Sequence, residues 1–394
     1  MQNKTLIIVR ISDFCKLFFD NNYGIFTMIW NSIRKSYFKL ILISFLLINW
    51  GNSQEVQSNS FFDGPHCFYN GDSLIINYYN NGIKESFWLS KKDANIFHGY
   101  LQDSLVTYSV PNHFKIQYDV HPNVDKIFVV SDIHGQYEIF RKLLYSNGII
   151  DKNNSWNFGE GHLVILGDVF DRGKQVHEAL WLIYNLENQA REKGGMVHLI
   201  LGNHEIMVLQ NDLRYVDEKY FTISKLFEID LHDLYNENTF WGRWLRSKNF
   251  ITIIDSYLFV HGGIHPELIN KYKSINEINR IMSVNIDTDR DKIKNTQELS
   301  GLFHSKGPIW SRGFFEPDTQ PEVSEIDLTN ILEHFSVEKI IVGHTTNDFI
   351  QSSYNQRIIN VDGGIKYGVK GEGLLILKNQ FHAVDSNGKH RLLF

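Results

Sequence analysis

Short apolar runs alternate with mixed segments along the chain from residue 124 onward. Five of these runs end abruptly, and Asp, Asn or His follows each within a few residues. The runs occupy residues 127–130, 163–166, 199–201, 258–260 and 340–342. Uninterrupted apolar runs of this length are typical of strands that are buried on both faces. The pattern therefore predicts buried strands whose ends carry polar, chemically reactive side chains.

Helical periodicity fills the intervals between some of these runs. The stretches "YEIFRKLLYSNGI" (137–149) and "VHEALWLIYNLENQAREKGG" (176–195) space their apolar residues at helical intervals and stop near glycines. Alternation of strands and helices predicts an α/β architecture with helices over the sheet faces. We assign residues 121–394 to this domain, with an aromatic, helical insertion at 211–249.

The segment before this domain has a different pattern. Residues 73–90, "SLIINYYNNGIKESFWLS", read as two strands around an Asn-Asn-Gly turn, which is the usual chemistry of a β-hairpin. We expect residues 54–120 to form a small β-rich region packed on the main domain.

The N-terminus carries the pattern of a secretory signal peptide at residues 28–53. Residues 40–50 are apolar, Arg34, Lys35 and Lys39 precede them, and the small residues Gly51 and Ser53 follow. The run is shorter than the roughly 20 apolar residues of a membrane-spanning helix. We expect a periplasmic or secreted protein without stable membrane insertion after cleavage; a membrane anchor formed by the uncleaved segment is the alternative. Met28 is a more usual start for such a peptide, so residues 1–27 are a candidate untranslated extension.

Charge and cysteine content narrow the function classes. Removal of residues 1–53 takes away six of 39 basic and two of 45 acidic residues, which leaves a net charge of −10. An acidic surface disfavours binding to nucleic acid or to an anionic membrane. Cys67 is then the single remaining cysteine, which excludes an internal disulfide and a thiolate metal site.

The residues at the strand ends form a coherent set of metal ligands. The motifs are "DIHG" (132–135), "GDVFDRG" (167–173), "GNHE" (202–205), "HGG" (261–263) and "GH" (343–344). Binding sites in α/β sheets form at the carboxyl ends of strands. Mixed carboxylate and imidazole ligands suit Mn, Fe or Zn, and Asp168 is placed to bridge two ions about 3.5–4 Å apart. Water held by such a pair becomes a nucleophile at neutral pH.

The motifs, in this order, resemble those of the calcineurin-like metallophosphoesterases over residues 124–365. The "GDxxDRG" and "GNHE" forms resemble the phosphoprotein phosphatase branch, and "NDLRYVDEKY", "GRWLRSKNF" and "PIWSRGFF" are similar to bacterial Shewanella-like phosphatases. The resemblance implies a β-sandwich flanked by helices in α-β-β-α layers, with two divalent metal ions. It implies Asp132, His134 and Asp168 as ligands of one ion. It implies Asp168, Asn203, His261 and His344 as ligands of the other.

The resemblance also implies catalytic roles. His204 matches the general acid, oriented by Asp171, and its ordinary pKa range suits proton donation near neutrality. Arg172 matches a phosphate clamp, because a guanidinium grips two phosphate oxygens at once. We carry Arg312 over as a second clamp. An ion pair between Arg172 and Asp171 is the structural alternative for that arginine.

Other polar residues receive structural interpretations. We expect Glu205 to orient the site, Asp362 to serve a turn or support a ligand, and Arg214 and Arg243 to be structural. The following histidines match no ligand spacing and are expected to be structural or on the surface: His121, His162, His177, His198, His265 and His304.

Three functions follow in order of preference. The first is hydrolysis of phosphomonoesters, in phosphoproteins or small phosphoesters, with manganese as the expected metal and iron or zinc as alternatives. The second is hydrolysis of dinucleoside polyphosphates or other phosphodiesters, because the same site serves both reactions. The third is a non-catalytic, metal-dependent binding scaffold, against which the presence of both His204 and Arg172 speaks.

Overall fold

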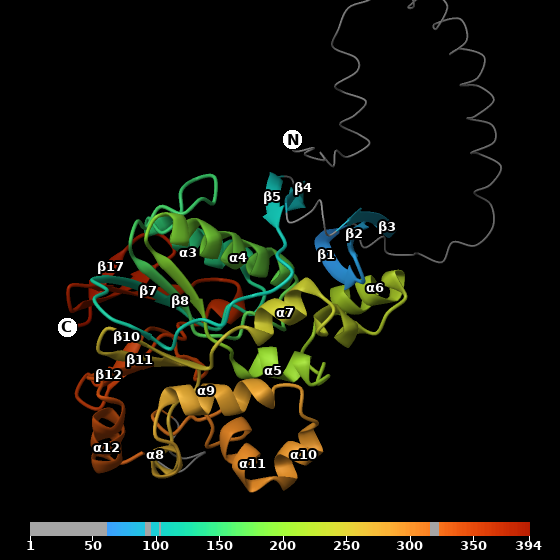
Figure 1. Ribbon diagram of the computed structural model, residues 1–394. Helices are drawn as coiled ribbons and strands as arrows, with labels where there is room; N and C mark the ends of the chain where they lie inside the picture. Colours follow the sequence, from blue (N-terminus) through green and yellow to red (C-terminus); the bar gives the residue numbers. More distant parts are fainter. Residues whose placement is uncertain (1–60, 91–95, 102–103, 316–322) are drawn as a thin grey trace, which may run out of the picture.

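The computed structural model describes residues 61–90, 96–101, 104–315 and 323–394 (Figure 1). The predicted signal peptide at 28–53 lies outside these residues. Within them, no helix is long and apolar enough to cross a membrane.

Two six-stranded mixed sheets form the centre of the described part of the chain. One sheet has the order β17 (His390–Leu392), β16 (Gln380–Asp385), β15 (Glu372–Leu377), β7 (Lys126–Val130), β8 (His162–Ile165) and β9 (Met196–Leu199). The other has the order β13 (Gln351–Ser353), β14 (Ile358–Asn360), β12 (Lys339–Val342), β11 (Tyr257–Val260), β10 (Ile251–Ile254) and β6 (Val120–His121). All five predicted apolar runs contribute to these sheets.

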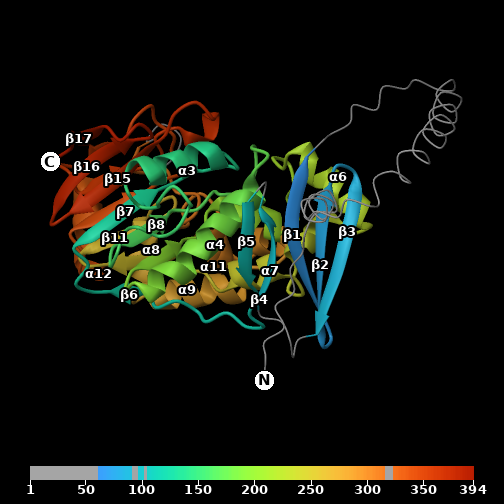
Figure 2. The same cartoon turned by 90° about the horizontal axis from the view of Figure 1, so that it is seen from above.

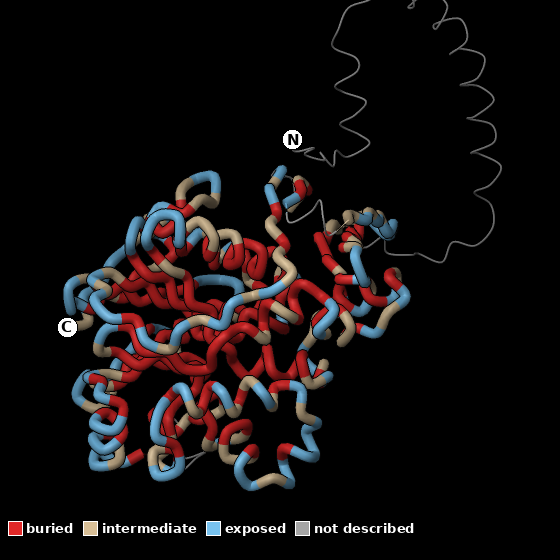
Figure 3. The backbone as a smooth tube through the Cα atoms, in the orientation of Figure 1, coloured by how far each residue is buried: buried red, intermediate tan, exposed pale blue. Residues whose placement is uncertain are grey.

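Both faces of the central strands are buried, as the apolar runs predict (Figure 3). Ile127 and Val129 of β7 pack in the layer between the sheets with Phe259 and Ile341. The alternate residues of β7 belong to the separate core under the helices. Side chains of a strand point alternately to opposite faces, so a continuous apolar run supplies both cores at once.

Helices cover the outer face of each sheet and complete the α-β-β-α layers that the sequence predicts (Figure 1). On one side lie α3 (Tyr137–Ser146) and α4 (Val176–Glu192). On the other lie α8 (Pro266–Lys271), α9 (Ile275–Val284), α10 (Arg290–Asn295), α11 (Gln297–Phe303) and α12 (Glu325–Phe335). The insertion at 211–249 contains α6 (Glu218–Phe227), the 3₁₀ helix η1 (Leu231–Tyr235) and α7 (Phe240–Arg246).

A small antiparallel sheet of β1 (Phe62–Asn70), β2 (Ser73–Asn80) and β3 (Ile83–Ser90) stands beside the insertion (Figure 2). β2 and β3 pair across Asn81 and Gly82, which confirms the predicted hairpin. A second hairpin, β4 (Ile96–Leu101) with β5 (Ser104–Ser109), leads toward the main domain. Phe68 of β1 also forms a bridge with Thr239, so the small sheet contacts the insertion directly.

Candidate active site

The ends of five strands converge on one cavity of about 120 Å³. Asp132 and His134 follow β7, Asp168 follows β8, and His344 follows β12. His261 follows β11 and lies fully buried behind the cavity. The lining residues are Asp132, His134, Asp168, Arg172, Asn203, His204, Tyr215, Trp310, Arg312, His344 and Lys366.

Asn203 and His204 are the first two residues of helix α5 (Asn203–Leu209), which begins shortly after the end of β9. Their side chains diverge because consecutive helix residues are rotated by about 100°. Gly202 precedes the helix, and a side chain there would overlap Asp168 Oδ1. Close approach of these two strand ends therefore requires glycine at this position.

Asp168 is at the centre of the site. Its Oδ2 lies 3.3 Å from His261 Nε2, 3.7 Å from His134 Nε2 and 3.9 Å from His204 Nε2. Two groups of ligand atoms, each within 4.8 Å, share this carboxylate: one with His134 and His204, the other with His261 and His344. The arrangement matches a carboxylate that bridges two ions, although it brings His204 close enough to be considered as a ligand as well.

The remaining predicted ligands complete both groups. Asn203 Oδ1 lies 3.0 Å from His261 Nε2, which places it with the second group. Asp132 Oδ1 lies 3.9 Å from His134 Nε2. The other Asp132 oxygen accepts hydrogen bonds from the Ser131 hydroxyl and from the His344 amide. The structure thus brings all six predicted ligands together.

The donor set fits divalent cations. His134 and His261 donate from Nδ1 to the carbonyls of Phe170 and Leu166, at 2.7 and 2.5 Å. These bonds direct each Nε2 into the cluster, the arrangement usual for metal-binding histidines. Nε2 of His344 is buried and has no hydrogen-bond partner among the residues that the structure describes, so it is available to a metal ion.

The electrostatics of the cluster also favour positive charge. Burial opposes protonation of His261, but Asp168 and Asp132 outweigh it and raise the His261 pKa to about 10. At Asp132, burial disfavours the charged carboxylate and raises its pKa, and the neighbouring Asp168 charge raises it further. Carboxylates that hold a proton on their neighbours in this way are able to hold a metal ion instead.

The backbone around the ligands adopts the left-handed region at residues that are not glycine. Positive φ angles occur at Asp132, His134, Asp168, Asp171, Arg172 and His344, between 47° and 70°. Such conformations cost about 1–3 kcal/mol each and cluster at functional sites. Glu205 stabilises one of these turns, because its carboxylate accepts hydrogen bonds from the amides of Asp168 and Val169 at 2.9 and 2.7 Å.

His204 and Asp171 form a buried pair at the cavity wall. His204 Nδ1 donates to Asp171 Oδ2 at 2.5 Å, which directs Nε2 toward Asp168 and the cavity. Burial lowers the His204 pKa, but the charges of Asp168 and Asp171 outweigh it and the net shift is upward. The pair has the geometry of an oriented general acid.

Cationic and aromatic side chains surround the mouth of the cavity. Arg172 lies over the Tyr215 ring at 5.3 Å, and no ion pair with Asp171 is found among the described residues. Arg312 lines the same cavity. The sequence pattern does not single out Lys366 or Trp310 as cavity residues, and it gives Tyr215 only as one of the insertion aromatics of which some could line the cleft.

The polar residues with structural interpretations lie outside the cavity lining. Asp362 accepts from Thr346 at 2.6 Å, and Lys366 bonds to the same hydroxyl. Arg214 pairs with Asp212, and Arg243 donates to the Asn112 carbonyl. His162 and His198 bond to each other at 3.0 Å.

Comparisons with known proteins define the class. The model of the calcineurin-like phosphoesterase family matches residues 125–348, and the chain belongs to this family of metallophosphoesterases. The family typically binds two metal ions.

Three individual proteins show which kinds of phosphatase in this family the chain is similar to. The crystal structure of a cold-active protein-tyrosine phosphatase from a psychrophilic Shewanella species is 35% identical, covers 85% of this chain and 100% of its own, and superposes with a TM-score of 0.79. Shewanella-like protein phosphatase 2 of Arabidopsis thaliana is 32% identical over 68% of this chain and 80% of its own. A symmetrical bis(5'-nucleosyl)-tetraphosphatase of Buchnera aphidicola is 29% identical over 46% of this chain and 58% of its own.

Proposed function

We propose that the protein is a phosphomonoesterase that acts on phosphorylated proteins with two divalent metal ions, manganese first among them. The observation that carries the proposal is the His204–Asp171 pair beside Asp168, in a cavity that Arg172 also lines. A non-catalytic scaffold needs metal ligands but has no use for an oriented proton donor. The names of the Shewanella and Arabidopsis relatives support a phosphoprotein substrate.

Each residue has a distinct task in this reaction. When bound, the two ions supply activation of water as the nucleophile and neutralise charge on the phosphoryl group. Asp132, His134, Asp168, Asn203, His261 and His344 would hold them. Arg172, with Arg312, grips phosphate oxygens and stabilises the charge that develops on them. His204 gives its Nε2 proton to the departing alkoxide, and Asp171 keeps the imidazole in the required orientation.

Hydrolysis of dinucleoside polyphosphates is the second candidate. Similarity to the Buchnera tetraphosphatase favours it, as does Lys366, which adds a third cation to the cavity lining. An extended polyphosphate needs several cations along its length, whereas one phosphoryl group needs fewer.

A substrate panel separates the candidates. Purified protein loaded with Mn²⁺ is assayed on phosphoserine, phosphothreonine and phosphotyrosine peptides, on p-nitrophenyl phosphate and on diadenosine tetraphosphate. We expect the highest kcat/KM on one of the phosphopeptides. A higher value for diadenosine tetraphosphate would contradict the phosphoprotein proposal, and inactivity on every substrate would contradict hydrolysis.

We further propose export through the signal peptide at 28–53, supported by its basic, apolar and small-residue segments. N-terminal sequencing of protein produced in a bacterial host should find a chain that starts near Gln54. A chain that retains residues 28–53 contradicts cleavage and supports a membrane anchor.

A further inference from the structure

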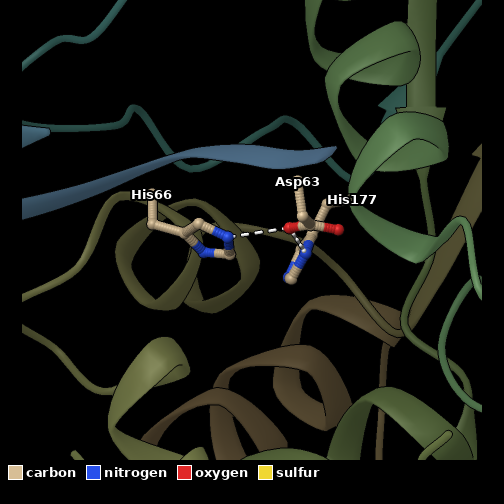
Figure 4. Close-up of side chains that lie close together, drawn as sticks. All are labelled: Asp63, His66 and His177. Atoms are coloured by element: carbon tan, nitrogen blue, oxygen red, sulfur yellow. Dashed lines mark hydrogen bonds and ion pairs between the residues drawn. The ribbon is translucent and has the colours of Figure 1, made fainter. Parts of the chain in front are cut away.

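A second buried group of Asp and His side chains lies between β1 and α4 (Figure 4). Asp63 Oδ1 lies 2.7 Å from His66 Nε2 and 2.7 Å from His177 Nδ1. All three side chains are buried. His177 follows no ligand spacing in the sequence, yet it is a central member of this group.

Lys219 supplies a counter-ion to the group, which argues against a second metal centre. Its Nζ lies 2.5 Å from Asp63 Oδ2 and donates to the Lys174 carbonyl at 2.6 Å. Burial raises the Asp63 pKa, but His177 and Lys219 outweigh it and hold the carboxyl ionised. The ammonium already balances this charge, and a divalent ion beside it would meet strong repulsion.

The ionised Asp63 carboxylate determines which atom donates and which accepts in the hydrogen bonds that lead from it to Tyr235. An ionised carboxylate only accepts, so His177 must donate from Nδ1. Burial lowers the His177 pKa to about 4, so the ring is neutral near pH 7 and its Nε2 accepts. The Tyr235 hydroxyl, 2.9 Å away, therefore donates to Nε2.

Tyr235 packs against residues 170–172, the loop that carries Asp171. Its ring packs edge-on against Phe170 with 5.1 Å between centroids. Tyr235, Phe170 and Asp171 also line a common cavity of about 10 Å³. The Phe170 carbonyl accepts from the metal-site histidine His134, and Asp171 accepts from His204.

The loop needs support from behind because its backbone is strained. Asp171 and Arg172 have φ angles of 70° and 65°. Such angles persist only where the surroundings over-determine them.

We propose that Asp63 is a positioning residue for the phosphatase reaction, which through His177 and Tyr235 holds residues 170–172 in the conformation that orients His204. The inference rests on the proposed function. It makes β1 of the small N-terminal sheet part of the active-site support.

The test compares Asp63→Asn and Tyr235→Phe with a matched control. Glu187→Gln removes a buried charge from α4, the helix that carries His177, where Glu187 accepts from Lys248 at 2.8 Å and from Trp244 at 2.9 Å. The Mn²⁺-loaded full chain is assayed on a phosphoserine peptide and on p-nitrophenyl phosphate. Metal content and amide hydrogen exchange at 168–173 are measured on the same samples.

We expect Asp63→Asn to lower kcat on the phosphoserine peptide about tenfold and on p-nitrophenyl phosphate less than about threefold, since a misplaced general acid matters most for a poor leaving group. Metal content should stay unchanged, and exchange at 168–173 should become faster. Tyr235→Phe should act in the same direction. Glu187→Gln should leave the ratio of the two rates and the exchange at 168–173 as in the wild type. In a His204→Asn background, Asp63→Asn should not change the ratio further.

Four outcomes would overturn the proposal. The first is that Asp63→Asn leaves both the ratio of the two rates and the hydrogen exchange at 168–173 unchanged. The second is that Glu187→Gln changes them as much as Asp63→Asn does, and the third is that Asp63→Asn changes the rate ratio further in the His204→Asn background. The fourth is that Asp63→Asn loses one equivalent of bound metal. If Asp63→Asn does not fold, Tyr235→Phe decides. If the wild type hydrolyses neither ester, the proposed function fails on its own, and hydrogen exchange still decides whether Asp63 supports the loop.

Discussion

Two buried groups of aspartate and histidine lie in this molecule, and they differ in what neutralises the carboxylate. In the described ion pairs of Asp168, every partner is a histidine. Asp63 has two histidines as well, but a lysine ammonium also lies 2.5 Å away. The first carboxylate lines a cavity and the second is enclosed. The same residue types therefore form a group of candidate metal ligands in one place and a group with its own counter-ion in the other.

The comparison shows that ligand-type side chains define a metal site only together with their surroundings. Around Asp168, three histidine nitrogens converge and no lysine or arginine is among the described ion pairs of the carboxylate; among the described residues, His344 Nε2 has no hydrogen-bond partner. Around Asp63, the His66 and His177 rings direct a nitrogen at Oδ1, and the Lys219 ammonium lies 2.5 Å from Oδ2.

Asp168→Asn should abolish the metal site. Loss of the bridging charge removes a ligand from both groups, so bound metal should fall well below that of the wild type and kcat should fall by several orders of magnitude. Metal analysis by mass spectrometry and a phosphopeptide assay measure both effects. Full metal content with full activity would show that Asp168 is not the bridge.

His204→Asn should lower kcat by about 10²–10⁴-fold while metal stays bound, because a general acid contributes that much. The loss should be smaller on p-nitrophenyl phosphate, whose leaving group hardly needs a proton. Rates on alkyl and aryl phosphates and metal content are measured on one sample. Loss of a metal equivalent would make His204 a ligand, and equal losses on both substrates would remove the general-acid role.

Lys219→Met should destabilise the fold by about 3–5 kcal/mol, because it leaves the buried Asp63 charge without its counter-ion. Urea unfolding gives the change in the free energy of unfolding. Addition of Asp63→Asn to Lys219→Met should recover part of the loss. Equal stability of wild type and Lys219→Met would mean that the ammonium is not the counter-ion, and increased metal binding by the variant would support a metal site there.

Glu178 of α4, which forms an ion pair with Lys219 of α6, should make stability depend on pH. Burial raises its pKa to about 7, although Lys219 works in the opposite direction. A raised folded-state pKa means that the folded form binds the proton more tightly, so this stabilisation is complete below about pH 4.5 and is lost as pH rises through 7. Glu178→Gln should therefore gain roughly 1–3 kcal/mol relative to the wild type between pH 4.5 and 7.5. Parallel pH dependences of the two proteins would contradict the shift.

The sequence pattern identifies the six residues that the structure brings together as candidate ligands, but it does not identify the residues that support them. The repeated ending of buried strands in Asp, Asn or His marks the six predicted ligand positions, because strand ends of a two-sheet fold meet at one place. Tyr215 and Lys366 carry no such mark, since they come from the insertion at 211–249 and from the short 3₁₀ helix η2 (Ile365–Tyr367). Asp63 and His177 lie 114 residues apart, and only tertiary packing joins them.

The sequence pattern also does not predict which residues of the site have positive φ angles. Positive φ angles at Asp168 and Arg172 arise from long-range hydrogen bonds, such as the one from the Arg172 amide to the Tyr215 carbonyl at 2.9 Å. Local propensity would assign such angles to glycine. The tertiary contacts override that preference at the points where the site is formed.

Anomalous scattering from crystals of the Mn²⁺-loaded protein tests the central contrast most directly. We predict two manganese peaks, one on each side of the Asp168 carboxylate, and none among Asp63, His66 and His177. A peak inside the Asp63 group, or fewer than two peaks at Asp168, would contradict the account.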